Sequence, residues 1–153
     1  MNGNSVHDGA KDYCAQLKAV DPKVKVAMVG PKTKKEYDNF AKKAINNADD
    51  CFDYYSFHFY AKQPGQVDYH GLLNSPVSDI PQVTKNIKKL LAKNPLTADV
   101  QLAMTEYNSY SSNPEVLAKQ TVNMLFLADM LGQAASNDVA LANHWFVGGV
   151  PSG

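Results

Sequence analysis

The feature that most constrains this chain is a regular alternation of helix-like and strand-like segments. Helical segments carry apolar residues at helical spacing or open with a capping residue and a proline, and strand segments are short and rich in β-branched or aromatic residues. Helices are expected at residues 8–20, 33–48, 78–93 and 113–135, strands at 24–30, 52–60, 100–106 and 139–147, and a loop at 61–77. This order predicts parallel strands joined by crossover helices.

Four such strands can form an open doubly wound sheet or half of an eight-stranded barrel, and two features favour the half barrel. The sequence begins in a helical segment and stops directly after a strand, as a piece cut from a longer periodic structure would. No glycine-rich phosphate-binding motif follows a strand. The predicted fold class is therefore α/β, half of a (β/α)8 TIM barrel, with residues 1–153 as a single partial domain.

Composition excludes several partners. The fifteen basic residues balance the fifteen acidic ones, and every basic residue is a lysine. The planar guanidinium of arginine binds phosphates and guanine edges better than a lysine ammonium does, so the absence of arginine argues against nucleic acid as a partner. No apolar run is long enough to cross a bilayer, so no membrane partner is expected. Cys14 and Cys51 lack metal-site spacing, and their pairing stays open. No metal or organic cofactor is implied.

The strand at residues 52–60 presents two different faces. Side chains alternate along a strand, so Ser56, His58 and Tyr60 share one face. The other face, with Tyr55, Phe57 and Phe59, is purely aromatic and suits packing against a helix layer. The polar face is therefore predicted to point into the barrel, with Tyr60 at the carboxyl end of the strand.

A carboxylate ends the next strand. Glu106 closes a face whose earlier members are apolar, Asn108 follows it, and the last strand ends in His144 and Trp145, the only tryptophan. Active sites of parallel α/β folds lie at these carboxyl ends. An indole can stack on a sugar ring, and a phenol and an imidazole can hold an ionised carboxylate. The pattern therefore predicts a sugar-processing site, although a solvated glutamate and a structural histidine are the plain alternatives.

Only half of a glycosidase's machinery is evident. A retaining glycosidase needs two carboxyl groups about 5–5.5 Å apart. Asp53 and Asp99 come at the starts of strands and therefore at the opposite rim, which leaves Asp68 in the predicted loop as a weak second candidate. Register also leaves open whether His144 or Trp145 faces the site, because a shift of one residue reverses the faces.

The segment Met104-Thr-Glu-Tyr-Asn108 resembles the nucleophile strand of retaining (β/α)8 glycoside hydrolases of the large clan with the acid/base on strand four and the nucleophile on strand seven. Within that clan it resembles the α-L-arabinofuranosidases of glycoside hydrolase family 51. Residues 19–26, 53–60 and 140–145 follow the same order and spacing as in that family. The resemblance implies that the chain is the C-terminal half of such a barrel, with strands five to eight.

The resemblance also implies roles for the strand-end residues. Glu106 would be the nucleophile, and Tyr60 would hydrogen-bond to it. The residues expected to bind the cleaved sugar are His58, Tyr60, Asn108, His144 and Trp145. The expected function is cleavage of glycosidic bonds in plant-type polysaccharides or oligosaccharides, α-L-arabinofuranosides above all, by double displacement. By the same resemblance the parent protein is expected to be secreted or periplasmic.

The family places its acid/base in a Gly-Asn-Glu motif at the end of strand four, and this chain begins Met1-Asn-Gly-Asn4. The acid/base glutamate is therefore expected directly before Met1. The chain alone, a fragment of a glycoside hydrolase, is then expected to be inactive on ordinary glycosides, because nothing protonates the leaving oxygen.

Two other functions remain open. The chain could be a non-catalytic carbohydrate-binding half barrel, or one that self-associates to cover its open strand edges at residues 24–30 and 139–147. A phosphate-sugar isomerase or aldolase would place glycine-rich turns after strands seven and eight, and Gly148-Gly149 is the one hint of that. No strand end offers Glu106 a lysine partner, which weighs against this second class.

Overall fold

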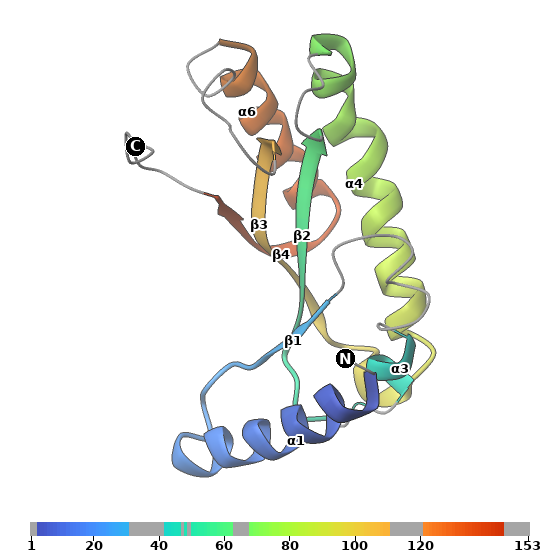
Figure 1. Ribbon diagram of the computed structural model, residues 1–153, viewed down its shortest axis with the longest axis vertical. Coiled ribbons are helices and arrows are strands. Elements are labelled where there is room, and N and C mark those ends of the chain that lie inside the picture. The colour runs from blue at the N-terminus through green and yellow to red at the C-terminus, as the bar shows by residue number, and fades with distance from the viewer. Residues whose placement is uncertain are drawn as a thin grey trace. The chain divides into compact units, whose positions relative to one another are not determined.

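The computed structural model describes residues 3–30, 42–46, 48, 50–62, 68–110 and 121–145. The elements in this part of the chain, in order, are α1 (Gly3–Val20), β1 (Ala27–Val29), α3 (Lys42–Asn46), β2 (Tyr54–Lys62), α4 (Tyr69–Leu91), the 3-10 helix η2 (Pro95–Thr97), β3 (Gln101–Tyr110), α6 (Thr121–Ser136) and β4 (Val139–His144) (Figure 1). No described helix has the length and apolar character needed to span a membrane. The predicted helix at 33–48 lies mostly outside the described residues, as does the start of the one at 113–135.

The strands form one four-stranded parallel sheet in the order β1-β2-β3-β4, with helices between them along the chain. This arrangement confirms the predicted half of a TIM barrel. β1 and β2 pair in register from Ala27 opposite Tyr54 to Val29 opposite Ser56. β1 is shorter than the predicted strand at 24–30, because the Val26 N–H bonds to the Asp53 carboxylate at 3.0 Å instead of to a neighbouring strand.

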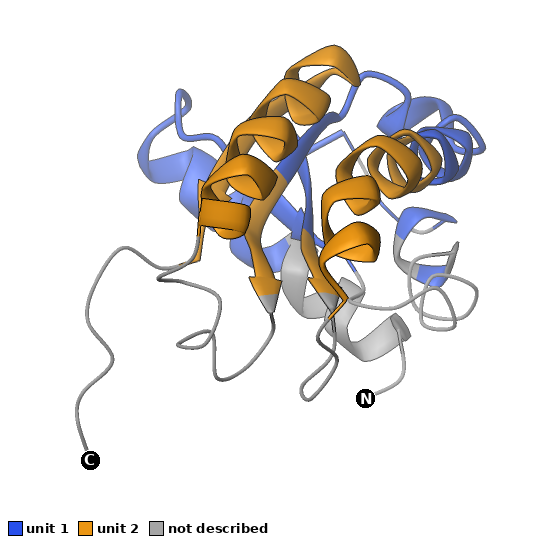
Figure 2. Ribbon diagram, turned by 90° about the horizontal axis from the view of Figure 1, so that it is seen from above, with its two compact units in different colours: residues 1–57, 85–103 blue, residues 58–84, 104–153 orange. Residues whose placement is uncertain are grey.

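The chain divides into two compact units, coloured separately in Figure 2. Unit 1 comprises residues 1–57 and 85–103, and unit 2 comprises residues 58–84 and 104–153. In unit 1 a disulfide joins Cys14 of α1 to Cys51, just before β2, which answers the question of pairing that the sequence left open. The Asn94 amide donates hydrogen bonds to the carbonyl oxygens of Ile45 at 2.7 Å and Ala48 at 3.1 Å.

The apolar stripe of α1 lies in solvent. Tyr13, Leu17 and Val20 follow helical spacing, and in the structure their exposed fractions are 71%, 49% and 89%. The buried anchor of this helix is Cys14, which is fully covered and disulfide-bonded. The spacing therefore identified one helix face correctly, but no described residue of the chain covers that face.

In unit 2 the helical segments lie on one side of the strands (Figure 2). The prediction of a loop over residues 61–77 is wrong at residues 61 and 62, which belong to β2, and from Tyr69 onward, where α4 begins. Residues 63–67 of that loop lie outside the described part of the chain. Pro76 and Pro81 interrupt the sequence pattern but are accommodated within the helix. Asp68 caps the helix: its Oδ1 accepts a 3.0 Å hydrogen bond from the Gly71 N–H.

The α6 helix is apolar on both of its faces. Asn123, Phe126, Met130 and Ala134 are buried, and α6 packs against β4. Met124, Leu125 and Leu131, on other sides of the helix, are each more than half exposed. After α6 the chain turns at Asp138, whose φ of 58° is in the left-handed region, and enters β4.

Candidate active site

The faces of β2 are those that the sequence predicts. Tyr55 and Phe57 are fully buried and Phe59 is 8% exposed. His58 and Tyr60, which alternate with them, are only partly covered. Because side chains alternate in a strand, the aromatic set holds β2 in the core of the fold and turns His58 and Tyr60 to the opposite face.

The side chains of His58 and Tyr60 both contact Glu106 of β3. The Tyr60 hydroxyl donates a 2.6 Å hydrogen bond to Glu106 Oε2. His58 Nδ1 lies 3.2 Å from the same oxygen, which makes an ion pair when the imidazole is protonated. The Glu106 side chain keeps 25% of its surface exposed and that of His58 keeps 34%, so solvent or a ligand can reach the group. All three residues belong to unit 2.

The phenol of Tyr60 acts as a fixed donor. Burial raises the pKa of Tyr60 above its ordinary value, and the hydrogen bond and negative charge of Glu106 raise this pKa further. The hydroxyl therefore keeps its proton at neutral pH and donates a hydrogen bond to Glu106. In the part of the chain that the structure describes, the contacts of Glu106 fall on Oε2 and leave Oε1 without a protein partner.

Asn108 lies two residues further along the same face of β3 but is used differently. Its side chain is only 5% exposed. Its Nδ2 donates to the carbonyl oxygen of Trp145, and its Oδ1 accepts from the N–H of Ser109 at 2.7 Å and from the Ser109 hydroxyl at 3.2 Å. Both polar atoms of the Asn108 side chain are therefore bonded to other groups of the protein. The sequence placed Asn108 close to Glu106 along the chain but did not reveal this bond.

Trp145 is held by its backbone and is half exposed. Its N–H donates a 3.0 Å hydrogen bond to the carbonyl oxygen of Tyr107, and its own carbonyl accepts from Asn108. The residue is 51% exposed. A half-exposed tryptophan with a fixed backbone is suited to stacking on a flat apolar surface, such as one face of a sugar ring.

His144 lies apart from the carboxylate. Its ring packs against that of Tyr107, with centroids 5.5 Å apart and planes tilted by 53°. Tyr107 alternates with Glu106 along β3, so its side chain points to the opposite face of the sheet. Burial lowers the pKa of His144 and favours its neutral form. The structure thus groups His58 and Tyr60 with Glu106, and it groups His144 with Tyr107.

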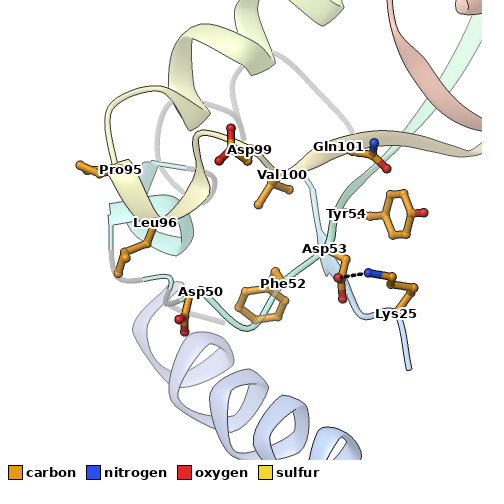
Figure 3. Close-up of a pocket in the computed structure, with 10 residues that line it drawn as sticks. All are labelled: Lys25, Asp50, Phe52, Asp53, Tyr54, Pro95, Leu96, Asp99, Val100 and Gln101. Atoms are coloured by element: carbon orange, nitrogen blue, oxygen red, sulfur yellow. Dashed lines mark hydrogen bonds and ion pairs between the residues drawn. The ribbon is translucent and has the colours of Figure 1, made fainter. Parts of the chain in front are cut away.

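The aspartates weighed as second carboxylates lie elsewhere. Asp53 precedes β2 and binds Lys18 at 3.0 Å and Lys25 at 2.8 Å; the hydrogen bond from Lys25 is the main reason why its pKa is lowered. Asp53 and Asp99 line a cavity of about 530 Å³ in unit 1, before the strands begin (Figure 3). Asp68 is the cap of α4. Among the described residues, Glu106 is the one carboxylate borne by a strand.

The described residues contain no group of three or more His, Cys, Asp or Glu side chains that could hold a metal ion. The side chains that the structure groups at Glu106 offer a carboxylate, a phenol and an imidazole. Such a site can bind a polyol and present a carboxylate oxygen to an electrophilic carbon.

The sheet order and the helices between the strands define the fold as half of a (β/α)8 barrel of the kind found in glycoside hydrolases. The α-L-arabinofuranosidase of Thermotoga maritima, solved with arabinose, matches 96% of this chain with a TM-score of 0.77 and 24% identity. A family 44 xyloglucanase from Paenibacillus polymyxa matches 97% at a TM-score of 0.73 and 17% identity. A family 51 α-L-arabinofuranosidase from Bifidobacterium longum matches 96% at 0.68 and 12%.

This chain spans only 30%, 38% and 34% of those three solved chains. No protein-family model and no curated protein matches the sequence. At these identities the likeness shows the fold, so the chemistry of the site must be argued from its own residues.

Proposed function

We propose that this chain carries the nucleophile side of a retaining glycosidase site, with Glu106 as the nucleophile and an α-L-arabinofuranoside as the substrate. The observation that carries the proposal is the convergence of Tyr60 and His58 on a single oxygen of Glu106. The hydrogen bond from Tyr60 and the contact of His58, both on one carboxylate oxygen, fix the orientation of the group. An aimed, ionised carboxylate is what double displacement at an anomeric carbon requires.

The two carboxylate oxygens of Glu106 have different roles in this proposal. Oε2 is held by Tyr60 and His58, and Oε1 attacks the anomeric carbon. A carbon–oxygen bond forms as the bond to the leaving group breaks, and the leaving group departs with the electron pair. The product of this first step is a glycosyl ester of Glu106, which water then hydrolyses. As the ester forms, the carboxylate loses its charge, and the two donors to Oε2 hold the carbonyl oxygen in place.

The leaving oxygen of an ordinary glycoside needs a proton. Within the described residues no second carboxylate is borne by a strand, and Asp68 is engaged as a helix cap. We propose that the acid/base is supplied by polypeptide outside this chain, in line with the 30–38% of each solved chain that this one spans. The 153-residue chain alone should then react only with substrates whose leaving group needs no proton.

The proposed substrate class rests on the exposed Trp145 ring and on the names of the similar structures. Two of the three similar solved proteins are described as α-L-arabinofuranosidases, one of them bound to arabinose. Trp145, held beside β3 by Tyr107 and Asn108, offers an apolar wall for the furanose ring. The Cys14–Cys51 disulfide supports our further proposal that the parent protein works in an oxidising compartment, secreted or periplasmic.

The test is covalent trapping with a 2-fluoro arabinofuranoside that carries a dinitrophenolate leaving group. Such a leaving group departs without a proton, and the fluorine slows hydrolysis of the ester. Intact-mass spectrometry should show one sugar added to the wild-type chain and none added to Glu106→Gln. Asp99→Asn, which removes a carboxylate from the opposite end of β3, is the matched control and should be labelled like the wild type.

A non-catalytic carbohydrate-binding role is the second candidate, and the half-exposed Trp145 ring is the observation that favours it. Glu106→Gln separates the two functions. A binding module would bind arabino-oligosaccharides equally well with glutamine at position 106 and would not be trapped in either form. Titration calorimetry of the wild type and this variant, beside the trapping experiment, therefore distinguishes a binding site from a nucleophilic one.

A further inference from the structure

His144 is a partly buried titratable residue that the proposed reaction does not use. It is the last residue of β4, and its ring packs against the ring of Tyr107, a residue that is 3% exposed. His144 Nε2 is buried and has no hydrogen-bond partner among the described residues. A protonated imidazole carries an N–H on both nitrogens, and a buried charged donor without an acceptor costs more free energy than a neutral one. The contact with Tyr107 therefore suits the neutral imidazole.

The charged and titratable groups around β4 do not offset a positive charge on His144. On β3, burial raises the pKa of Tyr107 and keeps its hydroxyl uncharged, and Glu106 points to the opposite face of the sheet. On α6, which packs against β4, Asp129 is the only charged residue, and it is partly exposed and lies outside the buried set of that helix. Asp138 precedes the other end of β4, about 20 Å along the strand from His144.

Trp145 directly follows His144 and is bonded to the same part of β3. Its N–H donates a 3.0 Å hydrogen bond to the carbonyl oxygen of Tyr107, and its carbonyl oxygen accepts from Asn108. Tyr107 thus contacts His144 through its ring and Trp145 through its backbone. Because His144 and Trp145 are adjacent at the end of a strand, loss of the ring contact should loosen both residues together.

We propose that His144 is a positioning residue for Trp145 and makes that position sensitive to acid. The neutral ring keeps the end of β4 against Tyr107, whereas the imidazolium, formed by uptake of one proton from solvent, leaves this contact and releases Trp145. The effect on Trp145 does not depend on the chemistry of Glu106. Its consequence, weaker sugar binding in mild acid, rests on the function proposed above, in which Trp145 forms a wall of the sugar site.

The pH range of the release follows from the environment of His144. Burial lowers the pKa of His144 below its ordinary value of 6.5. The stabilisation by the neutral ring is therefore full above the unfolded pKa and is lost as pH falls through the folded one. Release of Trp145 should occur below pH 6.5, and above about pH 5 most exposed carboxylates are still ionised.

The test is acrylamide quenching of the only tryptophan between about pH 7.5 and pH 5. In the wild type the quenching constant should rise up to about twofold on acidification, because a residue that is 51% exposed becomes fully exposed. His144→Phe keeps a ring against Tyr107 but takes up no proton, so its quenching should stay low throughout. His144→Ala removes the ring and should be strongly quenched at every pH. Circular dichroism checks that each variant is folded.

The other histidines of the described chain provide the controls. His70→Gln, at an exposed position of α4, should keep the acid response of the wild type. His58→Gln separates this response from the contact with Glu106 and should also keep it. In the proton NMR spectrum of the wild type, the ring signal of His144 should titrate with the same midpoint as the fluorescence change.

Four outcomes would overturn the proposal. They are a wild-type chain whose quenching does not change with pH, an acid response that persists in His144→Phe, a His144→Ala variant that is protected like the wild type, and a response that disappears in His58→Gln. The trapping of sugar on Glu106 is measured separately at about pH 7.5, where His144 is neutral. A failure of trapping at that pH contradicts the proposed function and leaves the role of His144 intact.

Discussion

The Tyr60 hydroxyl donates a 2.6 Å hydrogen bond to Glu106 Oε2, although the two residues lie 46 positions apart in the chain. The neighbouring parallel strands β2 and β3 bring them together. His58 reaches the same oxygen from two residues earlier on β2. The function that we propose depends on this three-residue arrangement, and its parts can be tested separately.

Removing the phenol donor should slow the trapping reaction. In Tyr60→Phe, Glu106 loses its shorter hydrogen bond and is less well oriented. Because a hydrogen bond to a charged group contributes about 1.5–3 kcal/mol, the rate of sugar transfer to Glu106 should fall about tenfold or more. Stopped-flow measurement of dinitrophenolate release reports this rate. Tyr13→Phe, at an exposed tyrosine of α1, should react like the wild type; equal rates for the two variants would contradict the role of Tyr60.

The Tyr60 proton should persist to high pH. The folded pKa of Tyr60 is raised above its unfolded value of about 10. The resulting stabilisation is full below that unfolded value and is lost as pH rises through the folded one. In a spectroscopic alkaline titration, the phenolate signal that Tyr60→Phe lacks should appear well above pH 10. In Glu106→Gln that signal should move to lower pH but stay raised, because burial is the larger cause. Ordinary titration of Tyr60 would contradict the buried contact.

Asn108 should control the position of the only tryptophan. Asn108→Ala removes the bond to the Trp145 carbonyl and leaves a buried site unfilled. The segment after β4 should loosen, and quenching of Trp145 fluorescence by acrylamide should increase. Asn46→Ala, at an exposed position of α3, is the control and should leave quenching unchanged. Identical quenching in both variants would show that Asn108 does not hold this segment.

Two glycines should respond in opposite ways to alanine. A Cβ on Gly30 would overlap the Ser56 carbonyl oxygen and the Tyr55 ring, whereas a Cβ on Gly132 of α6 would meet nothing within 4 Å. Gly30→Ala should therefore cost about 1–3 kcal/mol of unfolding free energy through overpacking. Gly132→Ala should gain about 0.5–1 kcal/mol through helix propensity. Urea unfolding of the two variants measures both changes, and a neutral Gly30→Ala would show that β1 can move away from β2.

The Cys14–Cys51 disulfide should stabilise unit 1. It closes a loop between residues 37 apart, for which the loss of entropy in the unfolded chain corresponds to about 3–4 kcal/mol. Adding a reductant should lower the urea midpoint of the wild type. The double variant Cys14→Ser with Cys51→Ser should unfold at a low midpoint whether or not reductant is present. A wild-type midpoint that does not respond to reduction would contradict a stabilising disulfide.

The alternation of segments predicted parallel strands joined by helices, but it left an open sheet and a half barrel as alternatives. The lack of a glycine-rich phosphate-binding motif after a strand favoured the half barrel. The faces of β2 were also predictable, since a strand alternates strictly and its aromatic face is distinct. The start of α4 was not predictable, because Pro76 and Pro81 interrupt the helical pattern of the sequence although the structure accommodates both prolines within the helix. The exposure of the apolar stripe of α1 could not be predicted either, because residue spacing defines a helix face but not what covers that face.

Within the site, strand order and alternation predicted that Tyr60, His58 and Glu106 lie at one rim of the sheet, and the family resemblance implied the bond from Tyr60 to Glu106. The bond from Asn108 to Trp145 was not predictable, because it joins residues 37 apart through a main-chain carbonyl, for which the sequence carries no signal. The position of His144 depended on register. The contact of its ring with Tyr107, on the face opposite Glu106, resolves that question in a way that spacing alone could not.

The most direct test of the account is to find the atom that carries the sugar after trapping. Peptide mapping by mass spectrometry of the chain treated with the activated 2-fluoro arabinofuranoside should place the sugar on Glu106, in the peptide that contains β3. A sugar on another carboxylate, or a wild-type chain that is not labelled under conditions where it is folded, would contradict the assignment of Glu106 as the nucleophile.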